Sequence, residues 1–343
     1  MNWMNKIILV FALLLVFETN QQLNAQDPNF SQFFASPLTI NPALTSDGES
    51  NWRAMANIRT QTIGIGSPYS TQSFSMDGKL KKMDEDNFLG IGGMVLADRS
   101  MEGAFKSTYL NVNASYHLSI DSRGNGLAVG LGFINNNTRV DYSTLTTDQQ
   151  LSSTGFDRAL PTGEPNLNPS ISYSSACAGI MFTHVNDYSF LNIGIAGYRF
   201  VNSSRSLLDN KALYVSPRYD IHADFGTVIH DDLNVTFSAI HLIQNGSSST
   251  SLGSSLAFGL RPGQFEMDQR RMLNAGIYYR LGDAIIPYIG YTHNEVQFGL
   301  SYDVNVSNVK SGSVSTRSFE VSLIYKRFSP NSTPRMGRYH SPI

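Results

Sequence analysis

The residues best suited to chemistry are Asp220, His222 and Asp224, in the pattern Asp-x-His-x-Asp. Alternate residues of a β-strand share one face, so these side chains would form a row with a spacing of about 7 Å. Such a row could bind a cation or orient the histidine as a general base. A solvated strand face has the same pattern, and one sequence identifies no nucleophile on a neighbouring strand. We therefore predict no catalytic, metal-binding or cofactor-binding residues.

Other motifs also favour a structural interpretation. The glycines of Gly90-x-Gly92-Gly93 and Gly130-x-Gly132 lie inside expected strands, whereas a phosphate-binding loop needs the start of a helix. We expect these glycines to allow close packing. Cys177 is the single cysteine, which excludes an intramolecular disulfide and a thiolate zinc site. We expect its thiol to pack within a strand.

Composition narrows the class of protein. Of the 343 residues, 41% are hydrophobic, 11% are aromatic and only 15% are charged. An ordinary soluble domain has about 25% charged residues. The aromatic content argues against disorder, and the net charge of −2 argues against binding to nucleic acid.

Residues 1–25 have the pattern of an export signal. Lys6 precedes the apolar run Ile7 to Phe17, and Leu23-Asn24-Ala25 resembles a cleavage site before Gln26. The run is shorter than the roughly 20 residues of a spanning helix, and no later stretch approaches that length. The mature chain is then expected to be a secreted soluble protein or a membrane β-barrel.

Alternation of apolar and polar residues predicts an all-β fold. In residues 295–306, side chains such as Phe298 and Leu300 share one face, and side chains such as Ser301 and Asp303 share the other. Similar segments predict about fourteen strands, at 51–60, 69–78, 87–98, 104–120, 125–138, 170–184, 187–199, 213–229, 232–243, 249–261, 271–281, 284–292, 294–306 and 316–328.

These strands favour a transmembrane antiparallel up-and-down β-barrel over residues 51–328. They have about 9–15 residues, which suits a spanning strand better than the mean soluble strand of about 5–6. A secreted β-sandwich or propeller is the alternative, although its strands would be shorter and more charged. On the last hairpin, we expect Glu295, Asp303 and Glu320 to face the lumen and pair with arginine or lysine.

Connection lengths predict short periplasmic turns and longer external loops. The longest external loops lie at about 139–169 and 201–212, and loops of this length without secondary structure are usually functional or disordered. The first loop combines apolar anchors with charges, which suits a protein interface. We predict that a partner binds Tyr142, Leu145, Leu151, Phe156, Leu160 and Leu167. The alternative is a loop that folds back to cap the pore and uses these side chains internally.

Two flanks lie outside the barrel. Residues 26–50 contain three prolines, so we expect an extended segment rather than a regular strand. We predict that this segment packs into or beneath the periplasmic end of the barrel through Phe30, Phe33, Phe34, Pro37 and Pro42. A disordered leader is the alternative. Residues 329–343 are expected to form an irregular periplasmic tail.

The flanks and the last hairpin carry a family resemblance. The run Gln26 to Phe33, followed by Ser36-Pro37-Leu38 and Asn41-Pro42-Ala43, resembles the mature N-terminus of the PorP/SprF family. Arg53 and Arg59-x-Gln61 are similar to the first strand of that family, and Phe298 to Val306 with Ser318 to Tyr325 resemble its closing hairpin. The resemblance covers the mature chain in order.

The resemblance implies a function that composition and spacing do not show. Family members are outer-membrane proteins associated with the type IX secretion system and gliding motility, and some serve one large secreted adhesin. We therefore expect a non-enzymatic outer-membrane accessory whose partners are outer-membrane lipid and a secreted adhesin or cargo sorting domain. Periplasmic components of the secretion machinery are further candidate partners. A passive pore for small solutes is the alternative, and an outer-membrane enzyme is a third hypothesis.

Overall fold

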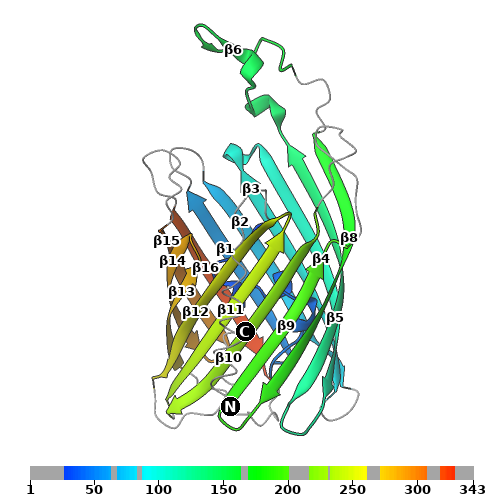
Figure 1. Cartoon of the computed structure of the whole chain (residues 1–343), viewed down its shortest axis with the longest axis vertical. Coiled ribbons are helices and arrows are strands. Elements are labelled where there is room, and N and C mark those ends of the chain that lie inside the picture. The colour runs from blue at the N-terminus through cyan, green and yellow to red at the C-terminus, as the bar shows by residue number, and fades with distance from the viewer. Residues whose placement is uncertain are drawn as a thin grey trace.

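The strands form one closed antiparallel barrel (Figure 1). The computed structural model describes residues 27–62, 68–82, 87–163, 169–200, 216–230, 232–260, 271–306 and 317–328. The strands of the barrel are β1 (Trp52–Thr62), β2 (Tyr69–Lys82), β3 (Phe88–Ser100), β4 (Phe105–Ser119), β5 (Gly126–Val140), β8 (Ser170–Val185), β9 (Ser189–Tyr198), β10 (Arg218–His230), β11 (Leu233–Gln244), β12 (Ser247–Gly259), β13 (Arg271–Arg280), β14 (Ala284–His293), β15 (Val296–Asn305) and β16 (Arg317–Arg327). Each strand pairs with its neighbour along the chain, and β1 pairs with β16 to close the ring. The prediction of a barrel with about fourteen strands is confirmed.

Alternation along each strand separates an apolar outer face from a polar inner face. On β15, Phe298 and Leu300 are exposed on the outside, whereas Ser301 and Asp303 are only 3% and 4% exposed. The same division on the other strands gives an exposed apolar outer surface, as a membrane-spanning barrel requires. Among the described residues, no helix is both long and apolar enough to cross a membrane.

The two ends of the barrel differ. We call the end that carries residues 141–169 the loop end, and the end with the short connections 120–125, 186–188 and 294–295 the turn end. The connection between β5 and β8 contains the 3-10 turns η5 (Tyr142–Thr144) and η6 (Asp148–Gln150), and the small strands β6 (Leu151–Ser152) and β7 (Gly155–Phe156). The expectation of a loop without secondary structure was therefore wrong. We call residues 142–160, which contain these turns and the paired strands β6 and β7, the loop-end hairpin. In Figure 1 the loop-end hairpin projects beyond the strands of the barrel.

Residues 27–50, which we call the lumen segment, lie inside the ring of strands and supply much of its core (Figure 1, dark blue). The expectation of an extended conformation is corrected here, because the segment folds into the 3-10 turns η1 (Phe33–Ala35), η2 (Pro37–Thr39) and η3 (Pro42–Leu44). Proline at the first position starts η2 and η3, since its fixed φ suits a helical turn and its missing N–H loses no bond there. The side chain of Asn41 caps η3 by accepting a hydrogen bond from the backbone N–H of Ala43 at 2.8 Å.

Candidate functional site: the filled lumen and the loop-end hairpin

The lumen segment places all five predicted docking residues inside the barrel. These residues are Phe30, Phe33, Phe34, Pro37 and Pro42, and all are buried. The ring of Phe34 lies 5.1 Å from that of Tyr288 and 5.5 Å from that of Tyr278, measured between centroids. Phe33 contacts the edge of Tyr278 as well. An aromatic core therefore joins the segment to β13 and β14.

The lumen segment runs along the barrel from one end to the other. Asp27 lies at the loop end beside Arg199 and Arg218, which flank the connection between β9 and β10. Near the turn end, the carbonyl of Gly48 accepts a hydrogen bond from Lys79 Nζ at 2.9 Å. The segment is thus not restricted to the end of the barrel at which β1 begins. Chain connectivity alone could not show this path, because the contacts join residues far apart in sequence.

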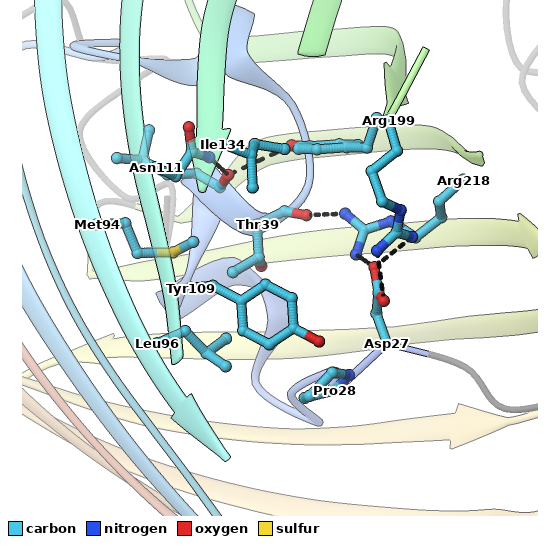
Figure 2. Close-up of a pocket in the computed structure, with 12 residues that line it drawn as sticks. Asp27, Pro28, Thr39, Met94, Leu96, Tyr109, Asn111, Ile134, Arg199 and Arg218 are labelled. Atoms are coloured by element: carbon cyan, nitrogen blue, oxygen red, sulfur yellow. Dashed lines mark hydrogen bonds and ion pairs between the residues drawn. The ribbon is translucent and has the colours of Figure 1, made fainter. Parts of the chain in front are cut away.

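Four charged residues anchor the segment at the loop end; we call Asp27, Arg199, Arg218 and Asp220 the loop-end ion cluster (Figure 2 shows the first three). Arg199 approaches the carboxylate of Asp27 with both terminal nitrogens, each at 2.6 Å. Arg218 Nη1 lies 3.1 Å from the same carboxylate. Asp220 holds Arg218 through two contacts of 3.0 and 2.8 Å. Two arginines and two carboxylates leave this buried cluster formally neutral.

The environment of Asp27 favours its charged form. Burial is the largest influence and would raise the pKa, but the charges of Arg199 and Arg218, with hydrogen bonds from Arg199 and Gln244, lower the pKa below its ordinary value. Beside the cluster lies a cavity of about 50 Å³, lined partly by Met94 and Tyr109. Its volume is far below the roughly 300–1,000 Å³ of a typical small-molecule site.

The opposite wall holds the segment through two strand carboxylates. Glu320 accepts hydrogen bonds from the backbone N–H groups of Ser31 and Gln32 at 2.7 and 3.0 Å. Asp303 accepts from the hydroxyl of Ser31 at 2.8 Å and lies 3.1 Å from both Arg59 and Arg280. Asp303 and Glu320 thus face the lumen as predicted.

Glu295 lies apart from Asp303 and Glu320, so the expectation that it faces the lumen was wrong, although it does pair with an arginine. It lies in the turn before β15, at the turn end, 3.3 Å from the exposed Arg327. Asp303, by contrast, is near the loop end of the same strand. The length of β15 separates the two, because the hairpin turn is short and the strand crosses the whole barrel.

At the turn end, one buried ion pair holds the last residues of the lumen segment. Arg53 Nε lies 2.8 Å from Asp77 Oδ1, and the two side chains are 1% and 0% exposed. Arg53 also donates to the carbonyl of Leu44 at 2.6 Å, and Asp77 accepts from the backbone N–H of Ser46. Each member of the pair therefore also binds the segment.

The Asp220, His222 and Asp224 row faces the lumen and is buried. The side-chain oxygen of Asn41 is used by the cap of η3, and its amide nitrogen lies 3.1 Å from His222 Nε2. Nδ1 lies 3.8 Å from Asp224. Within the described residues, no group of three or more His, Cys, Asp or Glu side chains is arranged to hold a metal ion. Two members of the row are linked to the lumen segment, His222 through Asn41 and Asp220 through Arg218, which binds Asp27.

Glycines in the wall make room for the segment. A Cβ on Gly130 would lie 2.2 Å from the backbone of Pro42 and Ala43, and one on Gly179 would lie 2.0 Å from Asn41 Oδ1. Cys177 is buried on the inner face of β8, with Sγ 3.6 Å from Asn113 Oδ1. These residues have packing roles, which agrees with the interpretation of the Gly130 motif from the sequence.

Five of the six predicted partner-binding residues lie in the described part of the connection between β5 and β8. Leu151, Phe156 and Leu160 are 59%, 58% and 38% exposed, whereas Tyr142 and Leu145 are partly buried. A capping box between Thr147 and Gln150 holds the base of the hairpin. Leu167 and the second loop, 201–212, lie outside the described residues.

Sequence reasoning missed the anchors of the lumen segment. Asp27, Arg53, Asp77, Arg199 and Arg218 were not singled out as site residues, although they hold both ends of the segment. A usable signal existed for Arg53 and Asp77. In a chain with only 15% charged residues, a charge on the inner face of an expected spanning strand needs a partner in the lumen.

The family model for "Type IX secretion system membrane protein PorP/SprF" matches residues 22–325. No curated protein matches the chain. Among solved structures, the CymD monoaromatic hydrocarbon channel is similar at a TM-score of 0.51 and 11% identity, covering 87% of this chain and 94% of that chain. A Pseudomonas aeruginosa FadL homologue has a TM-score of 0.47 and 10% identity, covering 83% of this chain and 92% of that chain. At such identities the similarity concerns the barrel fold alone.

Proposed function

Because the chain belongs to the PorP/SprF family of type IX secretion system membrane proteins, we propose that it is a non-enzymatic outer-membrane accessory of that system. In this proposal the barrel helps to secrete, place or retain a large secreted adhesin at the cell surface. The loop end faces outward, and the turn end meets periplasmic components of the secretion machinery. Residues 1–25 are removed as a signal peptide, 26–50 remain as a resident plug, 51–328 span the membrane, and 329–343 form a periplasmic tail.

One observation supports this proposal over a passive pore. The lumen segment occupies the barrel from the loop-end ion cluster to the Arg53–Asp77 pair, while the exposed apolar side chains of the hairpin extend away from it. A pore needs an open lumen, whereas an accessory that binds a partner needs an accessible surface with apolar anchors. The exposed pair Leu151 and Phe156 supplies such anchors.

Replacing residues 148–160 with a glycine-serine linker tests the proposal. We expect normal abundance of the barrel in the outer membrane but loss of the adhesin from the cell surface, because the binding anchors are gone. In the matched control, residues 121–124, which form a connection at the turn end, are replaced with a glycine-serine linker of the same length as the residues removed. Normal display of the adhesin by the hairpin variant would contradict the assignment of this surface. A rise in ion conductance of the purified hairpin variant in planar bilayers would favour a loop that caps a pore.

A further inference from the structure

A row of three cations crosses the outer surface of the barrel near the loop end. Arg99 of β3 is directly opposite Lys106 of β4, and Lys106 is directly opposite Arg139 of β5. All three side chains are exposed. Side chains in direct register on neighbouring strands are about 5 Å apart, so the row spans roughly 10 Å. Like charges in this position destabilise a sheet unless an anion binds between them.

In the described part of the chain no carboxylate lies within ion-pair distance of these three cations, although Asp141 is close enough to Lys106 to attract it electrostatically. Glu102 and Asp141 lie in the adjoining connections. Asp141 accepts hydrogen bonds from the backbone and the hydroxyl of Ser143 instead. At the turn end, the outward Arg327 is paired with Glu295 at 3.3 Å.

The residues below the row place it at the level of lipid headgroups. Moving from the row toward the middle of the barrel, the outer face of these strands first carries Thr108 and Asn137. The next level has Val95 and Leu110 beside Asn135, and the level after that has Phe133. Val95, Leu110 and Phe133 are 44%, 48% and 53% exposed, as lipid-facing side chains are. Four residues along a strand tilted by about 40° rise roughly 10 Å, which carries the row from the apolar surface into the headgroup region.

We propose that Arg99, Lys106 and Arg139 bind the phosphate groups of a phosphorylated glycolipid in the membrane leaflet at the loop end. A phosphate between these cations relieves their mutual repulsion and accepts charge-assisted hydrogen bonds. Ser70 and Ser170 continue the row on either side and add hydroxyl groups for a sugar headgroup. The acyl chains then lie against the apolar surface formed by Val95, Leu110 and Phe133. The full row would order lipid along β3, β4 and β5, directly beneath the hairpin.

The test measures lipid retained by the purified full chain. The protein is reconstituted in phosphatidylcholine nanodiscs that contain diphosphoryl lipid A, or lipid A without phosphates, and bound lipid is counted by native mass spectrometry. We expect retention of diphosphoryl lipid A only. The variant Arg99→Gln/Arg139→Gln should weaken its apparent affinity by about 5-fold for each arginine removed. The matched control Arg123→Gln/Arg271→Gln removes two exposed arginines at the turn end and should retain lipid normally.

Four results would overturn the proposal. Equal loss in both pairs of variants would indicate a general charge effect, and equal retention of phosphate-free lipid A would indicate apolar adhesion. Binding of inorganic phosphate in lipid A-free nanodiscs, without retention of diphosphoryl lipid A, would indicate an adventitious ion only. Heat-modifiable migration of each variant on gels verifies that the barrel is folded. The variant Arg99→Lys/Arg139→Lys, which keeps the charge, should retain lipid; its failure to do so in folded form would also reject a site based on charge.

Discussion

The lumen segment and the loop-end hairpin have similar compositions but opposite environments. Both lack long regular elements, and both combine aromatic and aliphatic side chains with a few charges. Phe34 of the lumen segment is completely buried, whereas Phe156 of the hairpin is 58% exposed. The difference arises from what surrounds each segment, because the barrel wall supplies carboxylates, arginines and glycines that match the lumen segment. The hairpin is held mainly by its own turns and caps, which leaves its apolar side chains available to a partner.

Among the charged residues, the largest predicted effect concerns the buried ion pair at the turn end of the lumen segment. Replacing Asp77 with Asn leaves Arg53 buried without its counter-charge, and we expect the free energy of unfolding to fall by about 3–5 kcal/mol. Urea unfolding in lipid vesicles measures this change. Asp283→Asn is the matched control, because its pair with Arg280 is 43% exposed on the Asp283 side and should be worth less than about 1 kcal/mol. Equal effects of the two variants would show that the lumen segment does not depend on this anchor.

A smaller effect is expected from closing the space between the wall and the lumen segment. In Gly130→Ala, the new Cβ would lie 2.2 Å from the backbone of Pro42 and Ala43, so the segment must move. We expect a loss of about 1–3 kcal/mol in the free energy of unfolding, with faster proteolysis of residues 27–50. In the control Gly93→Ala, the Cβ has only an ordinary contact at 3.7 Å and the segment should stay protected. Full protection of the segment in Gly130→Ala would contradict its position against β5.

The barrel was more predictable from the sequence than the contents of its lumen. Alternation depends on residues two positions apart, so segments such as 295–306 identified strands and their outer faces without further information. The path of the lumen segment depends on contacts such as Ser31 with Glu320, which are 289 positions apart. The prolines indicated that residues 26–50 are not a strand, but the cap by Asn41 and the 3-10 turns could not be distinguished from an extended chain.

Acid should loosen the loop-end anchor of the lumen segment. The folded structure lowers the pKa of Asp27, so its stabilising contribution is complete above the ordinary value of 3.8 and is lost as the pH falls through the folded value. We expect protection of residues 27–50 from protease to decrease below about pH 4 in the natural chain. In Asp27→Asn, protection should already be reduced at neutral pH and the acid-dependent step should be smaller. Acid steps of equal size in both proteins would assign the loss to other carboxylates.

The smallest effect on stability is expected in the hairpin, where the comparison between the two segments is most direct. Phe156→Ser removes an exposed ring and should change the free energy of unfolding by no more than about 0.5 kcal/mol. Phe34→Ser removes a buried ring that contacts Tyr278 and Tyr288, and should cost about 3–5 kcal/mol. Urea unfolding of both variants measures the two changes, and surface labelling measures the amount of displayed adhesin. If the hairpin binds the adhesin, Phe156→Ser should reduce display while stability is kept. A large loss of stability in Phe156→Ser would show that the ring packs against the protein itself. The hairpin would then be a packed segment, as the lumen segment is, rather than an exposed binding surface.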